Sequence, residues 1–229
     1  MIVYSLQRRE QEMEDQNNNL MEYQVIEQYR TLRTNIKLLN DEAKVIAVTS
    51  AKPEEGKTTV SVKLAESFSD IGEKILIIDG DLRKSKIKER YQVDNQGLTA
   101  YLSSSIELQD AIRHLKDNID IIPAGEPSME STTLLDSDKF RTMIHQLREN
   151  YDRIIVDTPS FLGISDAIIL IKECDGVLLV IEENKISNKT EQEVIEKLQA
   201  MGSNLLGVVL NKVTLKENLN PTIEYYTKR

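Results

Sequence analysis

Six short runs of Val, Ile and Leu recur along the chain and constrain its fold more than any other feature. The runs are KVIAVT, KILIID, IDIIP, RIIVDTP, GVLLVIE and LLGVVLN. Most are continuously apolar instead of alternating between apolar and polar residues, which is typical of parallel strands covered on both faces. Segments with helical spacing of their apolar residues lie between them, at 58–72, 136–151 and 188–202. This order predicts an α/β fold with a doubly wound, mostly parallel sheet flanked by helices, in which ligands bind beyond the carboxyl ends of the strands.

The chain of 229 residues is long enough for one such domain with short appendages. Residues 1–20 are polar and predict a flexible N-terminal arm. Residues 21–43 predict a helix with one apolar face, residues 44–212 predict the α/β domain, and residues 213–229 predict a flexible tail with an Asn-Pro pair. We therefore expect a single domain with an N-terminal helix and a C-terminal tail.

The composition argues against several classes of protein. No apolar run approaches the ~20 residues of a membrane-spanning helix, and the first residues lack the profile of a signal peptide, so a cytoplasmic protein is expected. The single cysteine, Cys174, rules out an intramolecular disulfide. The formal net charge of −9 argues against non-specific binding to nucleic acid.

The stretch SAKPEEGKTT, residues 50–59, follows the first apolar run and precedes a helical segment. Gly56, Lys57 and Thr58 have the chemistry of a phosphate-binding loop. The glycine lets the backbone approach phosphate, the lysine adds a positive charge, and the hydroxyl completes a Mg²⁺ shell. The strict pattern G-x-x-x-x-G-K-[ST] fails, however, because Ala51 stands at the position of its first glycine.

Two further acidic elements lie at the ends of apolar runs. Asp79 and Asp81 lie in ILIIDGDLRK, and Asp157 lies in RIIVDTPS. Phosphoryl transfer needs this combination of carboxylates that hold a metal ion, a cation on the phosphates, and a carboxylate near the attacking hydroxyl. A single aspartate after a strand often caps a turn instead, but three strand-end elements in this order favour a nucleotide site.

The series TSAKPEEGKTT, ILIIDGDLRK and IIVDTPS resembles the Walker A, Walker A′ and Walker B motifs of bacterial tyrosine kinases. It is similar in particular to the cytoplasmic kinases of capsule and exopolysaccharide loci, which are relatives of the MinD/ParA-type P-loop ATPases. The resemblance extends from about residue 21 to about residue 212 and includes EQYRTLRTNI, GLTAYL and LLGVVLNK. It implies a P-loop NTPase fold and a protein-tyrosine autokinase that uses ATP and Mg²⁺ and regulates capsular or exopolysaccharide synthesis.

The resemblance also implies which residues hold ATP. The matching positions are Pro53, Glu55, Gly56, Lys57, Thr58, Thr59 and Asn211. Lys57 would contact the β- and γ-phosphates, and Asn211 would recognise adenine, with a strand-end turn residue as the alternative for Asn211. Lys52 occupies the place of the signature lysine of MinD/ParA ATPases, which reaches across a dimer to phosphate, and kinases of this family also tolerate lysine there.

The family's catalytic and metal-binding residues match further positions. The catalytic group would comprise Lys57, Asp79 and Asp81, and the metal site would comprise Thr58, Asp79 and Asp157. Asp79 would act near the metal and the incoming tyrosine hydroxyl, as base or as orienting group. Asp81 and Asp157 would support the metal and its water.

The resemblance extends to self-association and to partners. Glu27, Arg30 and Arg33 match an E-x-x-R-x-x-R helix through which family members form rings, while a solvated helix face is the alternative. Tyr225 and Tyr226 in the tail would be phosphorylated by a neighbouring subunit, unless they are ordinary surface tyrosines. The implied partners are a membrane chain-length regulator, which activates the kinase and recruits it to the inner face of the membrane, and a cognate tyrosine phosphatase.

Three residues depart from the family pattern. Glu54 replaces a glycine of the P-G-x-G-K loop, where a glycine serves a positive φ or a close approach. If its carboxylate lay ~6 Å from phosphate, repulsion would cost roughly 0.7–2.8 kcal/mol per unit of phosphate charge, and little if it pointed to water. Ser85 and Ser160 replace prolines and are expected to loosen their loops. These departures leave open a pseudokinase that acts as a scaffold. A MinD/ParA-like ATPase is a further alternative, against which the E-x-x-R-x-x-R helix argues.

Overall fold

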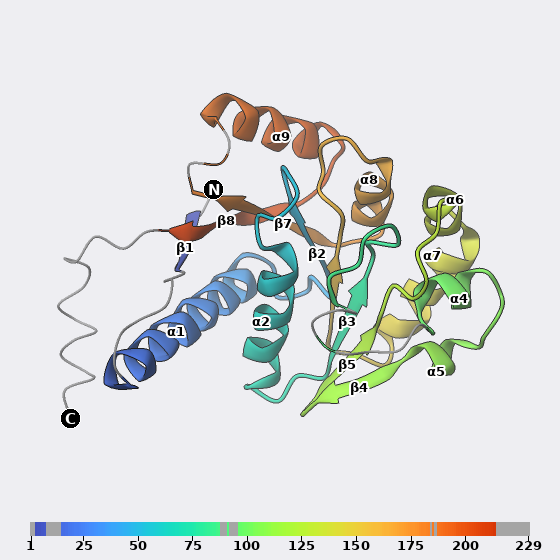
Figure 1. Cartoon of the computed structure of the whole chain (residues 1–229), viewed down its shortest axis with the longest axis horizontal. Coiled ribbons are helices and arrows are strands. Elements are labelled where there is room, and N and C mark those ends of the chain that lie inside the picture. The colour runs from blue at the N-terminus through green and yellow to red at the C-terminus, as the bar shows by residue number, and fades with distance from the viewer. Residues whose placement is uncertain are drawn as a thin grey trace.

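A computed structural model describes residues 3–7, 15–87, 91, 96–183, 185 and 187–213 (Figure 1). The strands are β1 (Val3–Gln7), β2 (Val45–Ser50), β3 (Ile75–Asp79), β4 (Arg113–Lys116), β5 (Ile119–Ile122), β6 (Arg153–Asp157), β7 (Gly176–Glu182) and β8 (Leu205–Val213). The helices are α1 (Asp15–Asn40), α2 (Lys57–Ser69), α4 (Leu98–Leu102), α5 (Leu108–Ala111), α6 (Ser131–Leu135), α7 (Asp138–Arg148), α8 (Ser165–Lys172) and α9 (Asn188–Ala200).

The strands of the described residues form one sheet in the order β1-β8-β7-β2-β6-β3-β5-β4. Neighbouring strands are parallel, except that β4 runs antiparallel to β5 at one edge. Strand β6 lies between β2 and β3, so the ends of these three strands, which carry the three predicted motifs, meet at one edge of the sheet. The predicted α/β fold with a doubly wound, mostly parallel sheet is confirmed.

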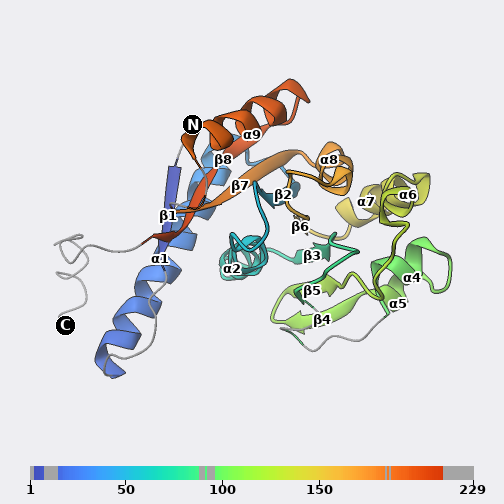
Figure 2. The ribbon, with the colours of Figure 1, turned by 45° about the horizontal axis from the view of Figure 1, so that its top comes forward.

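Helices cover both faces of this sheet (Figures 1 and 2). In β2, Ile46 and Val48 belong to the core that packs against α1 and α2. Val45 belongs to the core with α7 and α8, and Ala47 to the core with α8 and α9. Because successive side chains of a strand point to opposite faces, both faces of β2 must be apolar. The uninterrupted Val/Ile/Leu runs of the sequence follow from this double cover.

Two strands lie where the sequence predicts none. Val3–Gln7 forms β1, which pairs in parallel with β8, and α1 already begins at Asp15. The structure thus places a strand and the start of a helix within residues 1–20, for which the sequence predicted a flexible arm. Strand β4 is short and alternates between half-buried and exposed residues, so it lacks the apolar signal of the other strands. Among the helices of the described residues, none is long and apolar enough to cross a membrane.

Candidate functional site

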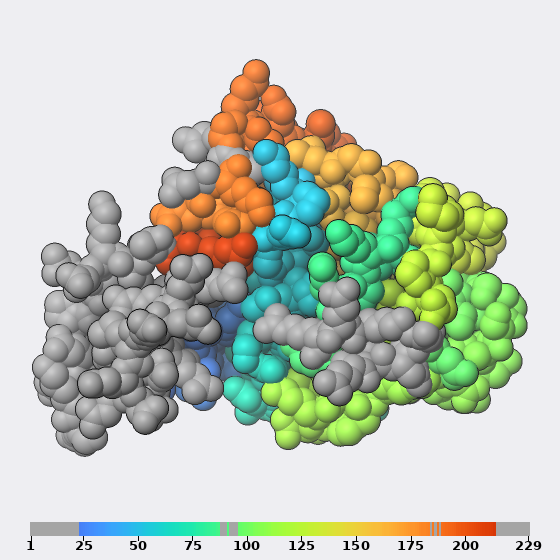
Figure 3. All heavy atoms as spheres, in the orientation of Figure 1, coloured from blue at the N-terminus to red at the C-terminus, as the bar shows by residue number. Residues whose placement is uncertain are grey.

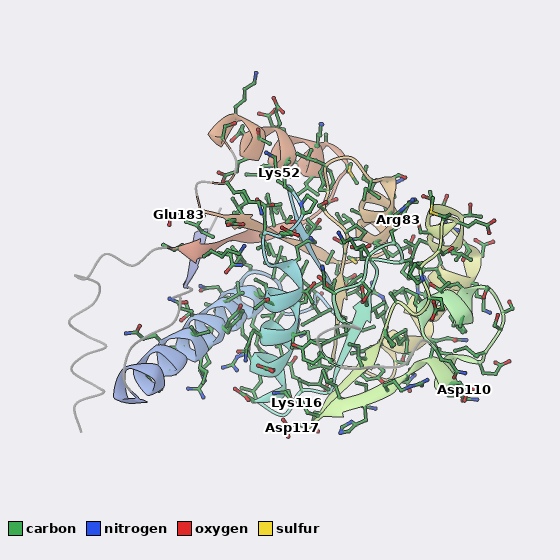
Figure 4. All side chains as sticks on the ribbon, viewed as in Figure 1. Lys52, Arg83, Asp110, Lys116, Asp117 and Glu183 are labelled. Atoms are coloured by element: carbon green, nitrogen blue, oxygen red, sulfur yellow. The ribbon has the colours of Figure 1, made fainter. Side chains whose placement is uncertain are left out.

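The residues predicted for the nucleotide and metal sites gather at the carboxyl edge of the sheet, at the ends of β2, β3, β6 and β8. Figure 4 shows Lys52 and Arg83 on this side of the molecule. Lys116, the last residue of β4, and Asp117, in the turn that follows it, lie on the opposite side. The segment from Ala51 to Gly56, here called the Walker A loop, connects β2 to α2. In Figure 3 this part of the chain reaches the surface above α2. The carboxyl edge of a doubly wound sheet is the place where such folds bind their ligands.

Gly56 ends the Walker A loop in a conformation that requires glycine. Its φ is +97°, and a Cβ at this position would lie 2.0 Å from Nδ2 of Asn211. That Nδ2 atom donates a hydrogen bond of 2.8 Å to the carbonyl oxygen of Glu55. Asn211, which is nearly buried at the end of β8, therefore holds the base of the loop in addition to any contact with a nucleotide.

Glu55 is fully buried and its carboxylate faces the inside of the loop. Its Oε2 accepts a hydrogen bond of 2.7 Å from the backbone N–H of Lys52, and its Oε1 accepts one of 3.5 Å from the backbone N–H of Glu182. The pKa of Glu55 is raised, because the effect of burial outweighs that of these hydrogen bonds, which lower it. This carboxylate is therefore a structural part of the loop.

Glu54 has the left-handed backbone conformation that a glycine would adopt without strain. Its φ is +67°, which costs a residue with a Cβ about 1 kcal/mol. Its side chain is exposed, where water screens its charge. The carbonyl oxygen of Glu54 accepts a hydrogen bond of 2.9 Å from Nζ of Lys212.

The carboxylate of Asp157, the last residue of β6, accepts hydrogen bonds from two hydroxyl groups of α2. The Thr58 hydroxyl donates to Oδ2 of Asp157 at 2.6 Å, and the Ser61 hydroxyl to Oδ1 at 3.1 Å. Burial raises the pKa of Asp157, while the hydrogen bond from Thr58 and the charge of Lys57 lower it. Ser61 was not predicted as a site residue, although its spacing of three from Thr58 places both hydroxyls on one face of the helix.

Asp79 lies beside Asp157, because the two residues are register partners in β3 and β6. Both carboxylates are almost completely buried. Burial, together with repulsion from Asp157, raises the pKa of Asp79. Ser85 donates its hydroxyl to Oδ2 of Asp79, and the backbone N–H of Asp81 donates to Oδ1 at 3.2 Å. Ser85 thus ties its loop to Asp79, contrary to the expectation that it loosens that loop.

Asp81 has a turn-capping role in this structure. Its Oδ1 accepts hydrogen bonds from the backbone N–H groups of Arg83, at 3.3 Å, and Lys84, at 2.9 Å. The Arg83 side chain then reaches Asp166 at the start of α8, with Nε 2.9 Å from Oδ2. These contacts fix the segment that follows β3 and carries Asp81.

Asp166 is a fully buried residue that the sequence does not single out. Besides Arg83, it accepts hydrogen bonds of 2.6 Å each from the hydroxyls of Ser131 and Thr132 in α6. Although burial opposes it, these bonds lower the pKa of Asp166. Nothing in the local sequence indicates this role, because its partners come from distant segments.

The donor set fits Mg²⁺ in the company of a nucleotide. Within the described ranges, no group of three or more His, Cys, Asp or Glu side chains is arranged to hold a metal ion alone. Thr58 and Asp157 supply a hydroxyl and a carboxylate at one point, with Asp79 adjacent. Mg²⁺ usually takes one or two carboxylates and completes its shell with phosphate oxygens and water, so this arrangement suits a Mg-nucleotide complex.

The remaining predicted residues are distributed as follows. Lys57 and Thr59 lie in the first turn of α2, and Pro53 lies in the Walker A loop. The predicted self-association residues lie on α1, where Glu27 and Arg30 form an exposed ion pair of 2.6 Å. The sites predicted for phosphorylation, at residues 225 and 226, lie outside the described residues.

Arg33, the third predicted self-association residue, is engaged within the chain. Its Nη1 donates to the backbone carbonyl oxygen of Ser67 in α2 and lies 3.3 Å from the Ser67 hydroxyl. It therefore links α1 to the helix that begins at the Walker A loop. Glu27 and Arg30 remain as the exposed part of the predicted motif.

Comparison with known proteins relates this geometry to named families. Residues 43–215 match the AAA domain family. The tyrosine-protein kinase CpsD of Streptococcus pneumoniae serotype 4 is 39% identical over 197 residues, covering 84% of this chain and 86% of that protein. The kinase domain of the Escherichia coli tyrosine kinase ETK has a TM-score of 0.83 at 27% identity, covering 96% of this chain and 92% of that chain. The septum site-determining protein MinD of Pyrococcus horikoshii, complexed with Mg-ADP, has a TM-score of 0.65 at 28% identity, covering 80% and 76%.

Proposed function

Because the chain belongs to the bacterial tyrosine kinase family, we propose that it transfers the γ-phosphoryl group of ATP to tyrosine hydroxyls, including its own. The observation that carries the proposal is the convergence of Thr58, Asp157 and Asp79 beside the start of α2. A hydroxyl and two carboxylates at this point, next to a glycine loop and a lysine, are the groups that phosphoryl transfer needs.

ATP binds in this proposal at the Walker A loop and the first turn of α2. Backbone N–H groups around Gly56 surround the phosphates, and Lys57 adds a positive charge to the β- and γ-phosphates. Nδ2 of Asn211 donates to the backbone oxygen of Glu55. We therefore assign the adenine contact to the side-chain oxygen of Asn211, Oδ1, which accepts from the adenine amino group.

Thr58 and Asp157 would hold Mg²⁺, which would neutralise charge on the phosphates. Asp79 is placed to accept the proton of the tyrosine hydroxyl or to orient that hydroxyl. Its burial and its neighbour Asp157 raise its pKa, which brings a carboxylate closer to the range in which a general base works. Asp81 holds the segment after β3 in place, and it would support the water around a bound metal.

The phosphoacceptors in this proposal are Tyr225 and Tyr226 of a second subunit. Glu27 and Arg30 are exposed on α1 and available to a neighbouring copy in a ring. Arg33 contributes by holding α1 against α2. A membrane chain-length regulator activates the kinase at the inner face of the membrane, a tyrosine phosphatase reverses the modification, and the cycle regulates capsular or exopolysaccharide synthesis.

Phosphotyrosine formation tests the proposal. The purified chain is incubated with Mg-ATP and the cytoplasmic tail of the partner, and its peptides are analysed by mass spectrometry. We expect phosphate on Tyr225 or Tyr226, and its loss in Lys57→Met. Lys172→Met, which removes an exposed lysine at the end of α8, is the matched control and should leave the phosphorylation unchanged.

Two other outcomes correspond to the alternatives. Nucleotide binding without phosphotyrosine under any condition would contradict the kinase in favour of a scaffold. Steady ATP hydrolysis with ATP-driven dimerisation, again without phosphotyrosine, would favour a MinD-like ATPase. The exposed side chain of Glu54 supports a functional nucleotide site over a disabled one.

A further inference from the structure

Three charged side chains at the ends of β7 and β8 converge on the outer edge of the Walker A loop. Glu182 is the last residue of β7, and Lys185 lies three residues further along the chain. Lys212 is near the end of β8. These three residues are here called the lysine clamp. None belongs to a sequence motif for phosphate or metal.

Each lysine of the clamp makes the same pair of contacts. Lys185 Nζ donates to the carbonyl oxygen of Pro53 at 3.0 Å and lies 2.9 Å from Oε2 of Glu182. Lys212 Nζ donates to the carbonyl oxygen of Glu54 at 2.9 Å and lies 3.0 Å from the same Oε2. One carboxylate oxygen therefore holds both ammonium groups against two successive carbonyl groups of the loop.

The clamp is partly shielded from water. Side-chain exposure is 23% for Glu182, 29% for Lys185 and 25% for Lys212. Although burial opposes it, the hydrogen bonds from Lys185 and Lys212 lower the pKa of Glu182. Ion pairs that share a partner and are partly buried hold their geometry better than isolated surface pairs.

The two carbonyl groups held by the clamp flank the strained position of the loop. Glu54 has φ +67°, a conformation that glycine adopts freely and glutamate does not. Without an external restraint, the Pro53–Glu54 turn would spend much of its time in other conformations. Its backbone N–H groups would then no longer be held in one arrangement.

We propose that the lysine clamp keeps the Walker A loop in its phosphate-binding conformation and thereby compensates for Glu54 in place of glycine. The inference rests on the proposed binding of ATP and adds positioning residues to that site. When only a fraction of the protein is competent to bind, the apparent Kd rises by the inverse of that fraction. Loss of the clamp therefore weakens nucleotide binding, and a glycine at position 54 makes the clamp unnecessary.

A set of variants tests this coupling. Lys212→Met and Lys185→Met are each made in the parent chain, in Glu54→Gly and in Glu54→Gln, and the Kd for Mg-ATP is measured by calorimetry. We expect about a fivefold weaker Kd in the parent and in Glu54→Gln, equivalent to about 1 kcal/mol, and less than a twofold change in Glu54→Gly. Glu54→Gln separates backbone from charge, because it removes the carboxylate and keeps the Cβ. Lys172→Met, a remote loss of one lysine, should leave every Kd unchanged.

The loop itself supplies a second measurement that needs no nucleotide. Amide hydrogen exchange at residues 52–58 should be faster in Lys212→Met than in the parent, and slow again in Lys212→Met combined with Glu54→Gly. An equal loss of affinity in all three backgrounds would show a simple charge effect and overturn the clamp, as would unchanged exchange. Failure of the parent and of Glu54→Gly to bind ATP would overturn the proposed function instead.

Discussion

Asp79 shows how single residues define this site. It is a buried carboxylate with a donor on each oxygen, the Ser85 hydroxyl on Oδ2 and the Asp81 N–H on Oδ1. A buried carboxylate without such donors would be free to rotate away from the tyrosine hydroxyl of the proposed reaction and would carry an uncompensated charge. Ser85 therefore positions Asp79, although a serine at this place departs from the family pattern.

Removal of the Ser85 hydroxyl tests this role. We expect Ser85→Ala to lower kcat for tyrosine phosphorylation about tenfold, because a hydrogen bond to a charged group contributes roughly 1.5 kcal/mol. The KM for ATP should stay within about twofold, since the loss of a transition-state contact affects kcat rather than ground-state binding. Ser85→Thr keeps a hydroxyl and should restore most of the rate. A loss of the same size in Ser85→Thr, or a parallel rise in KM, would contradict the role.

At the scale of elements, α1 is attached to the domain by more than its apolar face. Tyr29, Leu32 and Ile36 are buried in the core shared with α2. Arg33 adds a hydrogen bond to the backbone carbonyl oxygen of Ser67, near the end of α2. The helix that carries the predicted self-association motif is thus packed directly on the helix that begins at the Walker A loop.

Two arginines of α1, one turn apart, should behave differently when replaced. Arg33→Ala should lower the free energy of unfolding by about 1.5 kcal/mol, because a bond from a charged group to a half-buried carbonyl is lost. The unfolding midpoint should fall by roughly 3–6 °C for a chain of this length. Arg30→Ala is the matched control and loses only an exposed ion pair, so it should keep the unfolding midpoint of the parent. Its self-association, measured by light scattering, should be weaker than that of the parent. Equal midpoints for the two variants would show that Arg33 does not hold α1 in place.

Elements could be predicted wherever one strong signal defined them. The six Val/Ile/Leu runs predicted β2, β3, β5, β6, β7 and β8, because strands buried on both faces must be apolar throughout. β1 and β4 were missed, since they lie at the two edges of the sheet and have fewer buried neighbours to impose a pattern. Polar composition alone also suggested a flexible arm where Val3–Gln7 pairs with β8.

At the scale of the whole molecule, the site is assembled from segments far apart in the chain. Thr58, Asp79 and Asp157 could be predicted because each lies in a local motif at the end of a strand. Ser61, Asp166 and the lysine clamp could not, because only tertiary structure brings them to their partners. Asp166, for example, contacts Arg83 across 83 residues of sequence, and Lys212 contacts Glu54 across 158. The motifs supply the groups that are proposed to react, and distant segments hold those groups in position.

Such an assembly should be stabilised as a unit by its ligand. In the proposed function, Mg-ADP contacts α2 and the end of β8 and binds only the folded chain. At a concentration about 100 times its Kd, it should raise the free energy of unfolding by about 2.7 kcal/mol. The unfolding midpoint should then rise by roughly 5–10 °C, measured by calorimetry with and without the ligand.

The part of this stabilisation that depends on Mg²⁺ should require the carboxylate of Asp157. EDTA should remove most of the rise in midpoint for the parent chain, because the metal would link the phosphates to the Thr58 hydroxyl of α2 and the Asp157 carboxylate of β6. Asp157→Asn should show the same small rise with and without Mg²⁺, since the amide carries no charge to hold the ion. Ser160→Ala lies three residues further along, outside the hydrogen bonds of Asp157, and should respond like the parent. A full Mg²⁺-dependent rise in Asp157→Asn would place the metal elsewhere at this edge, with Asp79 as the remaining buried carboxylate beside it.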